Sequence, residues 1–160
     1  MLIRKAAADE MLRLWGFSDL DRAPNTAKFF YQNISDGNAI FYTADLNDIL
    51  IGELYAYLDL NDKDFADGNE TAYLCAFRVR KEYRCKGIGH LLMETALSDL
   101  KMKGFRYATI GVDDERNERL YRSFGFTMKI KDCFFDPCDI DDDMHPVYAQ
   151  TGFQLLKKEL

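Results

Sequence analysis

The sequence predicts one α/β domain that spans residues 1–160, in which helices pack on a sheet of six or seven strands. Three observations lead to this prediction. Strand-like and helix-like segments alternate along the chain, a strand runs through a glycine-bearing loop into a periodic helix over residues 72–103, and no repeat or linker divides the chain. A length of 160 residues and an apolar content of 48% are ordinary for a single domain with its own core.

The elements are predicted from hydrophobic periodicity. Strand-like segments lie at residues 1–7, 39–46, 49–60, 72–80, 107–112, 126–132 and 151–160. Helical spacing of apolar residues occurs at residues 8–14, 26–34, 88–103 and 114–123. About four helices are therefore expected to flank the sheet.

Turn and cap residues support these boundaries in chain order. Asn25 is placed to cap the second helix, and Asn47-Asp48 forms the turn of a hairpin. Gly104 and Gly125 end the third and fourth helices. The last two strands are expected to be separated by a polar loop over residues 133–150.

The charge and the cysteine content of the chain argue against several classes of protein. A net charge of −6 and a pI of about 4.9 argue against nucleic acid as a partner. No apolar run is long enough to cross a membrane, and Met1–Lys5 leads into charged residues instead of an apolar signal core, so a cytoplasmic protein is expected. The four cysteines lack metal-ligand spacing, and we expect free thiols and no metal site.

The segment Arg84-Cys85-Lys86-Gly87-Ile88-Gly89 carries the strongest functional signal. It joins an apolar strand to a helix, whose first N–H groups lack partners and whose dipole is positive at that end. Gly87 and Gly89 let an anion approach the backbone, and Arg84 and Lys86 add full positive charge. The segment is therefore predicted to bind a diphosphate. It lacks the third glycine of a dinucleotide fingerprint and the G-K-[ST] of a nucleotide-hydrolase loop.

The pattern R-x-x-G-x-G between a strand and a helix resembles the coenzyme A pyrophosphate loop of the GNAT acetyltransferase superfamily. The strand ending Phe77-Arg78-Val79 looks like the central strand of that family. Further along, Leu120-Tyr121-Arg122-Ser123-Phe124-Gly125-Phe126 is similar to its L-Y-x-x-x-G-F signature. The order and separation of these pieces match over residues 70–130. The resemblance implies a mixed, mostly antiparallel sheet that is splayed between its fourth and fifth strands.

The same resemblance implies an N-acetyltransferase that moves the acetyl group of acetyl-CoA to a primary amine by direct attack in a ternary complex. The pantetheine arm would lie in the splay and pair with the backbone of the fourth strand. Carried over residue by residue, the cofactor-binding positions are Phe77, Arg78, Val79, Arg84, Cys85, Lys86, Gly87, Ile88, Gly89 and His90.

Tyr121 is the general acid that the resemblance implies, because its phenol can donate a proton to the departing thiolate. The family often has an asparagine seven residues before this tyrosine, where it contacts the pantetheine. Here that position is Asp114, whereas Asn117 lies one helical turn before Tyr121. Asn117 is therefore included among the cofactor-binding residues, and Asp114 is either its alternative or only a helix cap.

The general base is left open between two carboxylates. Period-2 alternation places one set of side chains on the cofactor side of the fourth strand: Tyr73, Cys75, Phe77 and Val79. That set holds no carboxylate. Glu70, just before the strand, is the predicted catalytic carboxylate, and Glu53 on the third strand is the alternative.

The acceptor and the partners are predicted only by class. Acidic residues gather within 61–70 and 136–143, where they would attract a cationic amine such as a polyamine, an aminoglycoside or a lysine side chain, or would simply keep two loops solvated. The acceptor is expected to be a small molecule or a peptide. Exposed sheet edges and the habit of the family favour a homodimer. Two rival functions stay open, a non-catalytic acyl-CoA-binding module and a mononucleotide-binding domain.

Overall fold

The computed structural model describes all residues 1–160, and its elements follow the predicted order. The strands are β1 (Leu2–Ala6), β2 (Ala39–Leu46), β3 (Ile49–Tyr57), β4 (Thr71–Val79), β5 (Tyr107–Val112), β6 (Met128–Ile140) and β7 (Pro146–Glu159). The α-helices are α1 (Ala8–Leu14), α2 (Asn25–Ser35), α3 (Ile88–Met102) and α4 (Glu115–Ser123). Two single-turn 3-10 helices occupy Leu20–Arg22 and Lys81–Tyr83.

One seven-stranded sheet organises the molecule, with the strand order β1-β2-β3-β4-β5-β7-β6. Every neighbouring pair is antiparallel except β4 and β5, which run parallel. The predicted fold class, a mixed and mostly antiparallel sheet with about four flanking helices, is confirmed.

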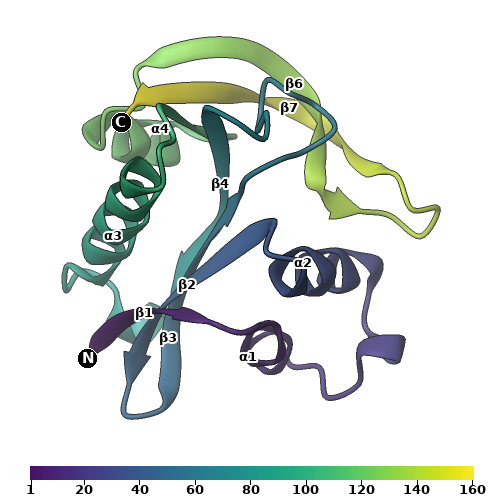
Figure 1. Ribbon diagram of the computed structural model, residues 1–160. Helices are drawn as coiled ribbons and strands as arrows, with labels where there is room; N and C mark the ends of the chain where they lie inside the picture. Colours follow the sequence, from purple (N-terminus) through teal and green to yellow (C-terminus); the bar gives the residue numbers. More distant parts are fainter.

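Two hydrophobic clusters cover the two faces of the sheet. Helices α1 and α2 lie against one face, and α3 and α4 lie against the other (Figure 1). On the α3 side, Leu92, Met93 and Ala96 are fully buried against Leu54 and Leu74 of the sheet. On the α1 and α2 side the cluster is aromatic and includes Phe30, Phe41, Tyr55, Tyr57 and Tyr73. The central strands are therefore buried on both faces, as their near-continuous apolar sequences require.

The sheet opens between its two parallel strands. The pairing of β4 with β5 covers only Thr71–Leu74, which lie beside Tyr107–Ile110. From Cys75 to Val79, β4 continues alone on that side, while β5 goes on pairing with β7. An unpaired stretch of a central strand leaves backbone N–H and C=O groups free for another partner. This opening is the splay that the sequence predicted.

A β-bulge lies where the splay begins. Ala76 has a positive φ of 50°, and the register with β3 shifts because Tyr55 pairs with Cys75 whereas Glu53 pairs with Arg78. One extra residue in β4 reverses the alternation of all following side chains. Cys75 packs toward the α1 and α2 side, and Phe77 and Val79 pack toward α3. The prediction that Tyr73 and Cys75 share a face with Phe77 and Val79 was therefore wrong.

The C-terminal hairpin is longer than predicted. The polar loop expected over 133–150 instead extends both strands, and only residues 141–145 form the connecting turn. Pro137 is accommodated because β6 is the last strand of the sheet and has a free edge. Shifts of register along the β6 and β7 pair break the alternation that a sequence pattern would reveal. Asp136 and Asp139 consequently lie on a strand.

Most other boundaries agree with the sequence to within a few residues. Asn47 and Asp48 both have positive φ in the predicted hairpin turn, and Gly104 follows α3 with a φ of 94°. Asn25 is the first residue of α2, and not its cap, and its side-chain amide donates instead to the Asp141 carbonyl. None of the helices is long and apolar enough to cross a membrane.

Candidate active site

Two cavities meet on β4 at the bulge. The larger, of about 810 Å³, is bounded by the segment between α1 and α2, by β3, by the end of β4 and by β6. The smaller, of about 330 Å³, lies in the splay between β4, β5, α4 and the β6 and β7 hairpin. Five residues line both cavities: Cys75, Ala76, Phe77, Asp136 and Asp139. A molecule in one cavity therefore contacts the same wall as a molecule in the other.

The loop after β4 presents free backbone donors at the start of α3. Gly87 caps the helix in the left-handed conformation, with φ of 80°. The Leu91 amide is the first to bond back, donating to the Gly87 carbonyl, so the amides of Ile88, Gly89 and His90 have no partner within the helix. These free donors and the positive end of the helix dipole lie at the loop for which the sequence predicts anion binding.

The two glycines of the loop have different roles. Around Gly87 a Cβ would meet no atom within 4 Å, so this position faces open space. At Gly89 a Cβ would lie 3.1 Å from the Phe77 ring, which means that this glycine lets the first turn of α3 pack on β4. Ile88 is buried in the core, and only its backbone can reach a ligand. Gly89 therefore has a packing role toward β4, while its amide remains one of the free donors.

The charged side chains of the loop are exposed. Arg84 donates from Nε to the Val79 carbonyl at 2.8 Å, which holds its guanidinium at the end of β4, where it lines the larger cavity. Lys86 places its Nζ 5.5 Å from the centre of the Tyr83 ring. The imidazole of His90 lies 2.9 Å from Glu94 on the surface of α3. Cys85 is an exposed free thiol with a positive φ of 60°.

The backbone of β4 points toward the splay at two of the predicted positions. The Arg80 amide donates to the Ile51 carbonyl on β3. Because backbone groups alternate in direction along a strand, the N–H and C=O groups of Val79 and Phe77 point away from β3 and toward the splay. Arg78 faces β3, and its side chain leaves the splay altogether. The structure thus places Phe77 and Val79 where a ligand strand would pair, and Arg78 on the opposite side.

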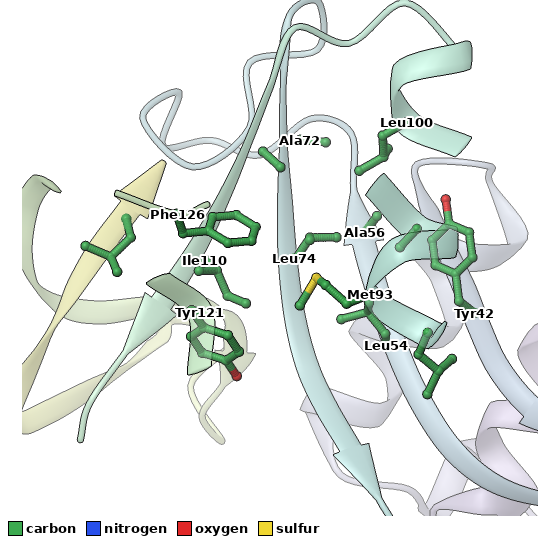
Figure 2. Close-up of a cluster of buried hydrophobic side chains, with 14 of the residues drawn as sticks. Tyr42, Leu54, Ala56, Ala72, Leu74, Met93, Leu100, Ile110, Tyr121 and Phe126 are labelled. Carbon is green, nitrogen blue, oxygen red and sulfur yellow. The ribbon is translucent and has the colours of Figure 1, made fainter. Parts of the chain in front are cut away.

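Tyr121 closes the inner end of the splay. Its ring packs beside Ile110 at the edge of the α3-side cluster, and its hydroxyl points out of that cluster (Figure 2). The residue is 8% exposed and lines the smaller cavity, and no protein group hydrogen-bonds its hydroxyl. Burial, together with the nearby carboxylates of Asp113 and Asp114, raises the pKa of Tyr121 to about 12. The phenol is therefore protonated at any physiological pH.

Asn117 and Asp114 have separate roles on α4. Asp114 caps the helix, since its Oδ1 accepts the Asn117 amide at 2.7 Å. Asn117 lies one turn before Tyr121 and lines the smaller cavity with it. Its side-chain amide donates to Asp114 Oδ2 at 3.1 Å. Of the two candidates, only Asn117 faces the splay.

Glu53 lies in the larger cavity but is fully engaged. Its carboxylate accepts from Trp15 Nε1 at 2.9 Å and from the Tyr55 hydroxyl at 2.6 Å, and it forms an ion pair of 2.7 Å with Arg78 Nε. The Arg78 guanidinium also lies 5.6 Å from the centre of the Trp15 ring. This network holds the segment after α1 against the sheet.

Glu70 is far from both cavities. It precedes β4 at the end opposite to the bulge, roughly 20 Å along the strand from Phe77 at about 3.3 Å per residue. Its side chain is half exposed and lies 3.4 Å from Arg106. The structure does not bring Glu70 together with Tyr121, because the two residues lie at different ends of the sheet opening.

Sequence reasoning did not single out Asp136 or Trp15 as site residues. Asp136 was placed in an acidic loop, whereas the structure puts it on β6 at the wall that both cavities share. Trp15 follows α1 and enters the larger cavity from the opposite side. The one available signal was that Trp15 is the only tryptophan of the chain, in a segment with weak periodicity.

A splayed mixed sheet beside an anion-binding loop defines the acetyltransferase class of fold. The sequence model of the acetyltransferase (GNAT) family matches residues 3–126, which is more than half of the chain. The chain therefore belongs to the GNAT acetyltransferase family. Among proteins of curated function, none matches the sequence significantly.

Solved structures of similar fold come from several bacteria. The ribosomal-protein-alanine N-acetyltransferase of Brucella melitensis is 16% identical, with a TM-score of 0.68 and 100% of both chains covered. The IAA acetyltransferase of Bacillus cereus is 17% identical, with a TM-score of 0.63 and 99% of each chain covered. A GNAT acetyltransferase of Elizabethkingia anophelis with acetyl-CoA bound is 20% identical, with a TM-score of 0.62 and 99% and 97% covered. At these identities the likeness shows the fold.

Proposed function

We propose that the protein transfers the acetyl group of acetyl-CoA to a primary amine by direct attack in a ternary complex. The observation that carries the proposal is the common wall of the two cavities. It lies beside the unpaired end of β4, which leads directly into the anion-binding loop. The cosubstrate takes the splay and the end of β4, where Val79 and Arg84 also border the larger cavity, and the acceptor takes the part of that cavity near Trp15, so the reacting groups meet at the bulge.

The residues around the splay fit acetyl-CoA. The free amides at the start of α3 and the side chains of Arg84 and Lys86 bind the pyrophosphate, since they supply both dipoles and charge. The outward-facing backbone groups of Phe77 and the Val79 amide pair with the pantetheine arm, while the Val79 carbonyl stays bonded to Arg84. Asn117 is placed to bond the same arm from α4. These contacts locate the thioester near Cys75–Phe77.

Tyr121 assists the departure of the sulfur. As the amine nitrogen bonds to the acetyl carbon and the carbon–sulfur bond breaks, negative charge develops on the sulfur. The Tyr121 phenol, protonated because of its raised pKa, donates a hydrogen bond to that charge. The amine gives up one proton to a base, and coenzyme A leaves as the thiol.

The acceptor is an amine that suits the part of the larger cavity where aromatic side chains lie near Asp136 and Asp139. Trp15, Phe17 and Phe30 line the apolar part of the larger cavity, and Asp136 and Asp139 lie at the end shared with the splay. Glu53 does not attract the amine, because Arg78 already neutralises it. A primary ammonium group on an apolar or aromatic body matches this arrangement.

A binding titration followed by a turnover assay tests the proposal. Calorimetry with acetyl-CoA, with ATP and NAD as controls, is expected to show selective micromolar binding of acetyl-CoA. Release of free thiol is then measured with tyramine, spermidine and a tripeptide with a free N-terminus. Turnover of at least one amine supports the acetyltransferase. Tight binding of acetyl-CoA without turnover of any primary amine would support a non-catalytic acyl-CoA-binding module, and equal binding of ATP would reject the cosubstrate.

A further inference from the structure

The wall between the two cavities holds two carboxylates, Asp136 and Asp139, and neither forms a salt bridge. The Oδ1 of Asp136, on β6, accepts the Cys138 amide at 3.0 Å, which fixes the carboxylate on its strand. Glu53, the other carboxylate deep in the site, is occupied by three donors. Asp136 is therefore the carboxylate that can still accept a proton or a further hydrogen bond.

The neighbouring carboxylate is less suited to the chemistry. Asp139 also lines both cavities, but its side chain is exposed and its Oδ1 accepts the Thr26 hydroxyl at 2.8 Å. That bond ties β6 to the start of α2 across the mouth of the larger cavity. Asp139 thus serves to hold the cavity closed on one side, and Asp136 lies further in.

We propose that Asp136 is the general base that accepts the proton of the attacking amine. The inference rests on the proposed acetyltransferase function and adds the residue that completes it. The amine enters through the larger cavity, and the thioester enters through the splay. The nitrogen therefore meets the acetyl carbon at the wall that Asp136 lines. Asp136 takes a proton from the ammonium group, the freed nitrogen bonds to the acetyl carbon, and the carbon–sulfur bond breaks. Tyr121 gives its proton to the sulfur and regains one from the nitrogen, which loses its second proton as the amide forms. The proton on Asp136 then returns to solvent.

The surroundings of Asp136 suit a base. Burial raises the pKa of this carboxyl above its ordinary value, so the carboxylate is a stronger base than an exposed aspartate. The titratable groups that face it from β3, β4 and β6 are Tyr57, Tyr73, Cys75, Cys138 and Asp139. None of them is a cation, and the charged groups elsewhere in the larger cavity are Glu53, Arg78, Arg80 and Arg84.

The test is the pH profile of the isosteric variant Asp136→Asn. With the fastest amine of the panel, kcat/KM at pH 7 is expected to fall about 100-fold, within the range that general-base catalysis contributes. The affinity for acetyl-CoA should stay the same. The acid limb of the wild-type profile should be lost, and the deficit should shrink toward pH 10, where the amine is already deprotonated. Asp132→Asn, on the same strand but outside both cavities, is the control and should keep the wild-type profile.

The outcomes separate this inference from the proposed function. If the wild type turns over an amine and Asp136→Asn keeps its kcat/KM within about twofold, the base is elsewhere. A lower rate with an unchanged acid limb would also overturn the role, because it would show that Asp136 only positions the acceptor. Asp136→Glu keeps a carboxylate and is expected to retain the acid limb at an intermediate rate. Absence of turnover by the wild type would instead reject the proposed function.

Discussion

Gly87 and Gly104 stand at the two ends of α3 in the same left-handed backbone conformation, with φ values of 80° and 94°. A Cβ at either position would meet no atom within 4 Å. The two residues therefore carry the same conformational requirement, and only Gly87 belongs to the anion-binding loop. They form a matched pair for separating the stability of the helix from the binding of the phosphate groups.

Alanine at either glycine is expected to lower the free energy of unfolding by about 1–2 kcal/mol, because a side chain disfavours positive φ. Only Gly87→Ala should weaken the binding of acetyl-CoA, by about tenfold. Urea unfolding and calorimetric titration of both variants measure the two effects. Equal loss of affinity in Gly104→Ala would show that the loop has no special part in binding.

Tyr121→Phe is expected to reduce kcat about 100-fold without changing the affinity for acetyl-CoA, since the hydroxyl acts only on the developing thiolate. The fold should tolerate the change, because no protein group hydrogen-bonds this hydroxyl. Tyr31→Phe removes an exposed hydroxyl that donates to Asp9, outside both cavities, and should leave kcat unchanged. Wild-type turnover by Tyr121→Phe would assign the role to another donor.

Glu53→Ala is expected to lower the free energy of unfolding by about 3–5 kcal/mol. The substitution leaves the Trp15 and Tyr55 donors unsatisfied, at about 1–3 kcal/mol each, whereas the Arg78 side chain is 59% exposed and can be hydrated. Glu70→Ala, which breaks the exposed pair with Arg106, should cost at most about 1 kcal/mol. Chemical denaturation of both variants compares the two losses. A small effect of Glu53→Ala would mean that solvent readily reaches the wall of the larger cavity.

Stability is expected to fall steeply above pH 10. Burial raises the pKa values of Tyr42, Tyr55, Tyr57, Tyr73 and Tyr121 above the ordinary value. The folded chain therefore holds these protons to higher pH than the unfolded chain does. The stabilisation is complete below pH 10 and is lost as the pH rises, for Tyr121 between about 10 and about 12. Each group contributes at most about 1.4 kcal/mol per pH unit.

Urea midpoints between pH 9 and 11, together with tyrosinate absorbance, check this expectation. Tyrosinate should appear together with the loss of folded structure, and not before it. Early titration of the buried tyrosines in the folded protein would contradict the burial of the aromatic cluster.

The element order could be predicted from periodicity and from local helix-cap chemistry, whereas the mixed, splayed sheet could be predicted only through the resemblance to the GNAT family. Gly87, Asp114 and Tyr121 lie where their local patterns indicated. The bulge at Ala76 could not be predicted, since alanine rarely adopts positive φ and the strain is imposed by pairing with β3. The position of Asp136 depends on how β6 pairs with β7. The turn that joins these two strands lies far from the rest of the site.

The larger cavity is bordered by two segments that are remote in sequence. The Thr26 hydroxyl at the start of α2 bonds Asp139 and the Ile140 carbonyl on β6. The family match covers residues 3–126, so it includes α2 but ends before β6 begins. Because Thr26 and Asp139 touch, we expect the two bordering segments to have changed in concert, so that their residues covary among related chains.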